Sequence, residues 1–179
     1  MKLYLVRHGQ TDYNLLNKFA GGKIDVPLNE KGLNQAKETK EILKNYDIDL
    51  IICSPMKRTR QTAEIINEDR HIEIIFDERL RERDLGELEN KFHSEVNRDN
   101  HWNYYYDNPY DLESIKSVEE RTFSFINDIK EKYNNRKILV VGHSGPFRLF
   151  DVYFYGIPED GELLNLKFKN CEVKEYLVE

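Results

Sequence analysis

Four short apolar runs, spread along the whole chain, constrain its fold more than any other feature of the sequence. They are KLYLV at 2–6, DLIIC at 49–53, IEIIF at 72–76 and KILVV at 137–141. All four are rich in β-branched residues. Short, nearly continuous apolar runs are typical of parallel strands that are covered on both faces. The sequence therefore predicts a mainly parallel central sheet.

Segments with the helical spacing of apolar side chains separate these runs. We expect helices over 30–44, 55–68, 115–133 and 146–155. Ser54 stands just before the second of them and is a candidate N-cap. Because strands and helices alternate, we expect the helices to cover both faces of the sheet.

The C-terminal part departs from this alternation. The segment ELLNLKFK at 162–169, followed by CEVKEYLV at 171–178, is typical of a hairpin with Asn170 at its turn. We therefore predict an α/β fold, a three-layer sandwich with a mainly parallel central sheet and a C-terminal hairpin. No linker or repeat divides the chain, so one domain over 1–179 is expected.

Composition argues against several classes of partner. The chain has 179 residues, a formal net charge of −6 and no apolar run close to the ~18 residues of a membrane helix. A negative charge argues against nucleic acid, because binding its backbone needs a basic face. Cys53 and Cys171 are too few and too far apart for a disulfide framework or a zinc site, so we expect reduced, buried thiols. With a strand at the start in place of a signal peptide, these features predict a cytoplasmic protein.

Polar residues follow each predicted strand directly. In sheets of this kind ligands bind beyond the carboxyl ends of the strands, so these residues are expected to meet in one crevice. They are Arg7, His8, Gly9, Gln10 and Thr11 after the first strand, Ser54 and Arg58 after the second, Arg79, Arg81, Glu82 and Arg83 after the third, and His143, Ser144 and Gly145 after the fourth.

The chemistry that fits this set is phosphoryl transfer. Arginine is a natural clamp for phosphate, because its fork matches two phosphate oxygens and stays charged. The helix that opens on HSGPF adds backbone N–H groups that favour an anion. A histidine can accept the phosphoryl group on a ring nitrogen, and a carboxylic acid can protonate the leaving oxygen.

Four motifs resemble the histidine phosphatase superfamily, in its phosphoglycerate-mutase-like branch. They are LVRHGQT at 5–11, SPMKRTRQTA at 54–63, LRERDLGELE at 80–89 and VVGHSG at 140–145, in the family's order and over nearly the whole chain. The arginine-histidine-glycine triplet alone would be a weak signal, but the four together are specific. The branch includes small phosphatases such as the alpha-ribazole phosphatases.

The resemblance implies a role for each matching residue. His8 resembles the phosphohistidine nucleophile, and Glu82 resembles the general acid. The positions that it implies for phosphate or substrate binding are Arg7, Gln10, Asn14, Arg58, His143 and Ser144. The expected reaction is metal-independent hydrolysis of a phosphomonoester without a cofactor. The expected partner is a small phosphorylated metabolite, and a homodimer is left open.

The segment 87–113 is the candidate lid over this site. It carries seven carboxylates against Lys91 and Arg98, and it lacks the paired arginines of the mutases that it resembles. An acidic lid favours hydrolysis over exchange in a bisphosphate. Its aromatic residues form either a stacking surface for a ring-bearing substrate or the packing of the lid, and we favour packing for most of them. They are Phe92, Trp102, Tyr104, Tyr105, Tyr106 and Tyr110.

Other readings of the motifs are weaker. Pro146 stands where a serine hydrolase elbow needs glycine, and the arginines would repel a metal ion held by His8 and His143. Two alternatives stay open: a cofactor-dependent phosphoglycerate mutase, and a module that binds phosphate without turning it over.

Overall fold

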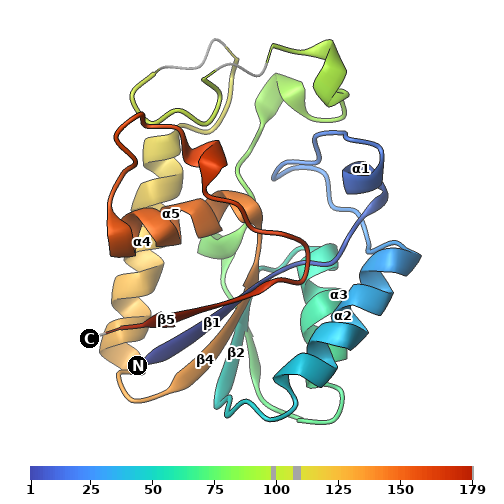
Figure 1. The fold of residues 1–179 in the computed structure, drawn as a ribbon, viewed down its shortest axis with the longest axis vertical. Helices are drawn as coiled ribbons and strands as arrows, with labels where there is room; N and C mark the ends of the chain where they lie inside the picture. Colours follow the sequence, from blue (N-terminus) through green and yellow to red (C-terminus); the bar gives the residue numbers. More distant parts are fainter. Residues whose placement is uncertain (98–99, 107–109, 179) are drawn as a thin grey trace.

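The computed structural model describes residues 1–97, 100–106 and 110–178. Its centre is one five-stranded sheet in the order β3-β2-β4-β1-β5 (Figure 1). The strands are β1 (Lys2–Arg7), β2 (Leu50–Cys53), β3 (Ile74–Phe76), β4 (Lys137–Gly142) and β5 (Val173–Leu177). The first four are parallel and β5 is antiparallel to β1. The predicted mainly parallel sheet is confirmed.

Helices cover both faces of this sheet, so the three layers are also confirmed (Figure 1). They are α2 (Glu30–Leu43), α3 (Lys57–Asn67), α4 (Ile115–Lys132) and α5 (Ser144–Tyr155). The short helix α1 (Asp12–Leu15) has no buried residue and does not cover the sheet. Strand side chains alternate between faces. Leu3 and Leu5 therefore pack with α4 and α5, whereas Tyr4 and Val6 pack with α2 and α3.

The predicted C-terminal hairpin is wrong in its first arm. The structure has a short 3-10 turn, η4 (Leu163–Asn165), within 162–169, and only β5 follows as a strand. The reason lies in the partners of the backbone. The carbonyl oxygen of Phe168 accepts a hydrogen bond from Nη1 of Arg7 at 2.8 Å, and the N–H of Cys171 donates to the carbonyl of Arg7 at 2.9 Å. The tail thus crosses the end of β1 before it pairs along that strand.

Three further 3-10 turns follow β3: η1 (Glu78–Leu80) precedes the candidate lid, η2 (Gly86–Leu88) lies at its start and η3 (His93–Glu95) lies within it. The described residues of 87–113 contain no α-helix and no strand of a sheet, only these turns and isolated bridges such as Asn103 with Glu162. Arg98, one of the two basic residues of the predicted lid, lies outside the described residues.

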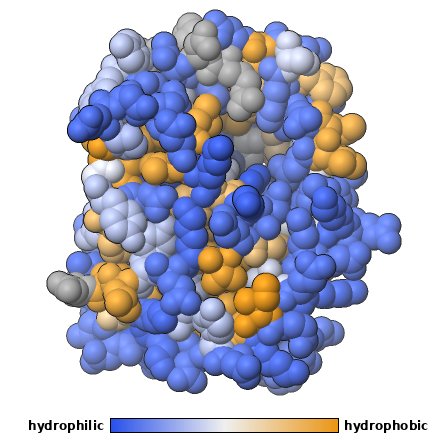
Figure 2. Space-filling model, in the orientation of Figure 1, coloured by the Kyte–Doolittle hydropathy of each residue, from blue (hydrophilic) through white to orange (hydrophobic). Residues whose placement is uncertain are grey.

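Two other expectations concern the cysteines and membrane-spanning helices. Cys53 and Cys171 are both free and buried, as predicted. Among the described residues, no helix is long and apolar enough to cross a membrane. Figure 2 shows one face on which hydrophilic side chains predominate and apolar ones form small separate groups.

The register of the parallel strands determines where the polar residues meet. Arg7 pairs with Gly142, and Cys53 pairs with Val141. The next residues along the chain are His8, Ser54 and His143, and they leave the sheet at one edge. The predicted crevice lies at this edge.

Candidate active site

A cavity of about 350 Å³ opens at the carboxyl ends of the strands. Several of its walls come from the predicted site and others from α1, the loop after it and the lid. The lining residues are Arg7, His8, Thr11, Asn14, Asn17, Lys18, Phe19, Ala20, Gly21, Arg58, Glu82, Leu85, His93, His101, Trp102, Ser144, Arg148, Leu164 and Asn170. The volume suits a small ligand.

His8 is held in one orientation by its own loop. Its Nδ1 lies 2.7 Å from the carbonyl oxygen of Gly9. A carbonyl only accepts hydrogen bonds, so Nδ1 carries the proton and Nε2 keeps a free lone pair. Burial, and then the charges of Arg58 and Arg7, hold the pKa of His8 well below its usual value of 6.5. The ring is therefore neutral and nucleophilic at neutral pH.

His143 is fully buried next to His8, with the two ring centroids 5.2 Å apart, and it is not among the residues that line the cavity. Its Nε2 is 2.9 Å from Oγ of Ser54. The predicted N-cap role of Ser54 is therefore wrong: α3 begins at Lys57, the cap is Met56, and the hydroxyl of Ser54 orients a ring. Burial, and then the charge of Arg58, also lower the pKa of His143 well below 6.5. Its buried Nδ1 has no hydrogen-bond partner among the described residues.

Arg7 and Arg58 supply positive charge beside the two histidines. Arg58 is 2% exposed, and its guanidinium donates to the carbonyls of Gly21 and Ile24, each at 3.0 Å. Burial lowers the pKa of Arg58 to about 10, and burial also lowers the pKa of Arg7. Both groups stay charged at neutral pH. They are fixed by carbonyl oxygens rather than by carboxylates, so their charge is not neutralised within these contacts.

Glu82 reaches the same cavity from the segment after β3. Its Oε1 accepts hydrogen bonds from the backbone N–H of Gly145, at 3.1 Å, and of Arg83, at 2.9 Å. Helix α5 begins at Ser144, two residues before the predicted 146, so Gly145 offers one of the unpaired N–H groups of its first turn. A Cβ on Gly145 would lie 2.0 Å from this Oε1, so only glycine allows the contact.

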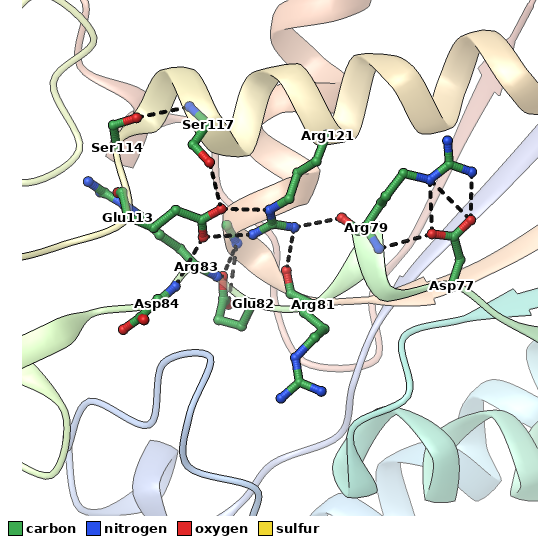
Figure 3. Close-up of polar contacts among 11 residues, drawn as sticks. Asp77, Arg79, Arg81, Glu82, Arg83, Asp84, Glu113, Ser114, Ser117 and Arg121 are labelled. Atoms are coloured by element: carbon green, nitrogen blue, oxygen red, sulfur yellow. Dashed lines mark hydrogen bonds and ion pairs between the residues drawn. The ribbon is translucent and has the colours of Figure 1, made fainter.

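A salt-bridged arginine fixes the backbone around Glu82 (Figure 3). Nη1 of Arg121, on α4, donates to the carbonyls of Arg79 at 2.6 Å and Arg81 at 2.8 Å. Its Nε and Nη2 donate to the carboxylate of Glu113 at 2.8 and 3.0 Å. Glu113 also accepts from the N–H of Asp84 at 3.2 Å. The backbone is therefore held on both sides of Glu82.

None of the three predicted arginines of this segment lines the cavity, although the sequence places them after a strand. The Arg79 guanidinium pairs with the carboxylates of Asp77 and Asp128, each at 2.7 Å. Nη2 of Arg81 donates to the carbonyl of Gly22 at 3.0 Å. Arg83 turns to the lid, where Nε donates to the carbonyl of Glu113 at 2.6 Å. Their roles in the fold are therefore structural.

The remaining predicted positions separate into two groups. Asn14 and Ser144 line the cavity. Asn14 is fixed there because its Oδ1 accepts from the N–H of Thr11 at 3.0 Å. Gln10 is not among the lining residues, and its Oε1 instead accepts from Nδ2 of Asn29 at 3.2 Å, at the start of α2.

Several cavity residues were not predicted from the sequence, among them Asn17, Lys18, Arg148 and Asn170. Asn170, predicted as a turn residue, lines the cavity and donates from Nδ2 to the carbonyl of His8 at 2.8 Å. No local pattern signals this contact between residues 162 positions apart. Arg148 lines the cavity from α5. The sequence does contain a pattern that indicates this position for Arg148, because Arg148 stands one helical turn after Ser144 and on the same helix face.

Comparison with known proteins finds matches over nearly the whole chain. A sequence model of the histidine phosphatase superfamily (branch 1) matches residues 3–179. The protein described as uncharacterized phosphatase PhoE of Bacillus subtilis (strain 168) is 37% identical over 175 residues, which cover 96% of this chain and 88% of that protein. The adenosylcobalamin/alpha-ribazole phosphatase of Escherichia coli (strain K12) is 28% identical over 167 residues, covering 89% and 82%.

Solved structures agree as well. Bacillus stearothermophilus YhfR superposes with a TM-score of 0.88 at 28% identity, over 99% of this chain and 91% of that one. The residues that the family model matches, 3–179, include every residue of the cavity and all of the sheet except Lys2. The chain belongs to branch 1 of the histidine phosphatase superfamily.

Proposed function

We propose that the protein hydrolyses phosphomonoesters through a phosphohistidine at Nε2 of His8. The observation that carries this proposal is the hydrogen bond from Nδ1 of His8 to the carbonyl of Gly9, which leaves Nε2 as the free base inside the cavity. Arg7 and Arg58 lie beside it and provide positive charge for a phosphate dianion.

The reaction has two steps. Nε2 attacks phosphorus, the bond from phosphorus to the ester oxygen breaks, and the carboxylic acid of Glu82 gives its proton to the leaving oxygen. Water then attacks phosphorus, the carboxylate of Glu82 takes a proton from it, and the P–N bond breaks to release phosphate and free His8. The contact of Glu82 with the N–H of Gly145 keeps the carboxyl group in the cavity through both steps.

His143 contributes as a phosphate ligand in this proposal. Its Nδ1 is buried without a partner, and such a group is stabilised when an acceptor or donor of the substrate reaches it. The arginines supply the charge that a metal supplies in other phosphatases, so we propose metal-independent catalysis without a cofactor. Two buried, free thiols are compatible with a cytoplasmic setting.

The test is to replace the nucleophile and follow both phosphate release and the intermediate. His8→Ala is expected to abolish phosphate release from p-nitrophenyl phosphate and to leave no phosphoenzyme that is stable in base and labile in acid. His71→Asn, at an exposed site outside the cavity, is the matched control and should retain both. Retained turnover in His8→Ala contradicts the mechanism. Conversion of 3- to 2-phosphoglycerate faster than phosphate release would favour the mutase alternative.

A further inference from the structure

Arg148 is a cavity residue that the two steps above do not use. It lies on α5 one turn after Ser144, so both side chains are on the same helix face and both line the cavity. Its guanidinium carbon is 4.9 Å from the ring centroid of Trp102, a lid residue that is 5% exposed. The stack holds the guanidinium plane but satisfies none of its N–H donors.

The donors of Arg148 have no acceptor among the described residues. Its Nε is buried without a hydrogen-bond partner. Arg83, whose guanidinium carbon is 4.6 Å from the same Trp102 ring, differs in this respect because its Nε donates to the carbonyl of Glu113. Burial lowers the pKa of Arg148 to about 10, so the group is charged at neutral pH. A desolvated cation with free donors is costly unless an anion meets it.

The charges of the cavity leave one cation without a negative partner. Arg7, Lys18, Arg58 and Arg148 line it, and none of the four forms an ion pair within 4.0 Å with a described carboxylate. The carboxylate of Glu82 lines the same cavity and offsets one of these positive charges. A phosphomonoester carries close to two negative charges at neutral pH and offsets two more. One positive charge remains, and one further negative charge on the ligand would balance it.

The size of the cavity limits the distance between the two anions. Arg148 lines the same cavity of about 350 Å³ as His8 and Ser144. A phosphoryl group at His8 and an anion at Arg148 therefore belong to one small ligand, in which only a few bonds separate them.

We propose that Arg148 binds a carboxylate of the substrate, so that the site takes small phosphomonoesters bearing a carboxylate within a few bonds of the ester oxygen. This inference rests on the proposed function and names its substrate class. A single guanidinium fork matches a monoanionic carboxylate, whereas the phosphate dianion has two arginines. The basic group that binds the second anion therefore lies on α5 and not in the acidic lid.

The experiment compares substrates that differ in the carboxylate. O-Phosphoserine is compared with phosphoethanolamine, and 3-phosphoglycerate with glycerol 3-phosphate, by phosphate release. For the wild-type enzyme we expect kcat/KM to be about 10- to 100-fold higher for the carboxylated member of each pair. This is the gain that a charge-assisted hydrogen bond from Arg148 to the carboxylate would give. In Arg148→Met this ratio should fall to near one, and in Arg148→Lys it should be intermediate. The ratio within one variant is independent of how much folded enzyme is present.

The outcomes distinguish a failure of the carboxylate site from a failure of the proposed hydrolysis. A wild-type ratio near one, or an unchanged ratio in Arg148→Met, overturns the carboxylate site and leaves the hydrolase intact. A bisphosphate preferred over all four compounds, with that preference lost in Arg148→Met, also overturns it, because Arg148 would then bind a second phosphate. Hydrolysis of none of the four, nor of p-nitrophenyl phosphate, would overturn the proposed function itself.

Discussion

The floor of the cavity and its lid are built by different means. On the floor, His8 and Arg58 line the cavity and His143 lies next to His8. All three are at most 3% exposed and stand at the ends of strands or in the first turn of a helix. In the lid, the described residues form turns, and Tyr105 is 60% exposed. Glu82 belongs to both regions, since its carboxylate binds the N–H of Gly145 while its backbone is held through α4 and the lid. Rigid geometry is thus concentrated where the reacting atoms meet.

The largest expected effect is on the floor. Arg58→Met should lower kcat/KM for p-nitrophenyl phosphate by about 1,000-fold, because a buried cation beside the nucleophile is lost. Arg60→Met is the matched control on the same helix, since Arg60 is exposed and its guanidinium carbon lies 4.6 Å from the Phe76 ring centroid. An equal loss in both variants would show that general damage to α3 explains the result.

The second-largest effect is expected at Arg121, which holds the backbone between the floor of the cavity and the lid. Arg121→Met removes the donors that hold the carbonyls of Arg79 and Arg81, so Glu82 should lose its position. We expect kcat to fall about 10- to 100-fold while KM changes little, with partial recovery in Arg121→Lys. Lys132→Met, exposed on the same helix, is the control. A purely structural role predicts instead a lower melting temperature with an unchanged kcat per folded molecule.

A smaller effect is expected within the lid. Trp102→Ala removes a buried ring that packs with Val118 and Leu149, so it should destabilise the fold by about 3 kcal/mol and raise KM about tenfold. Because the ring contacts Arg148, the rise in KM should depend on the substrate carboxylate, and it should be no larger for aromatic phosphates than for aliphatic ones. Tyr105→Ala should leave KM within about twofold. An effect of Trp102→Ala on aromatic phosphates alone would favour the stacking surface for ring-bearing substrates.

The smallest expected effect is a change in the pH dependence of stability. The pKa of His143 is lowered by burial, and then by Arg58, so below about pH 6.5 the unfolded chain binds a proton that the folded chain does not. The free energy of unfolding therefore decreases as pH falls through this window, by about 1.4 kcal/mol per pH unit for this histidine. Urea unfolding of His143→Gln between about pH 6.5 and 5 should show a slope shallower by that amount. An unchanged slope would mean that His143 is protonated in the folded protein.

Much of the floor could be predicted because its signals are local. The four apolar runs became β1 to β4 within two residues at each end, and the residues after them meet as parallel strand ends must. Arg7, His8, Arg58 and Glu82 all line the cavity. The lid could be predicted only as an insertion, because its segment carries no period of 2 or 3.6 to read.

The wrong predictions for Ser54 and Gln10 share one cause. Ser54 fits a helix cap by its position in the sequence, but its hydroxyl lies 2.9 Å from Nε2 of His143, which is 89 residues away. Gln10 sits in one of the four motifs that resemble the family, yet its side chain bonds to Asn29. In each case a side chain had two polar partners within reach, and only the packing of distant elements selected one.

The sequence by itself determined the strands, the layers and several of the residues that line the cavity, among them Arg7, His8, Arg58 and Glu82. Apolar period and strand-end position depend on neighbours along the chain, so both can be read without coordinates. The tertiary structure alone decided that 162–169 wraps the end of β1 instead of forming a strand, and that Asn170 and Arg148 enter the cavity. Those outcomes depend on which distant backbone and side-chain groups remain unpaired once the sheet has formed.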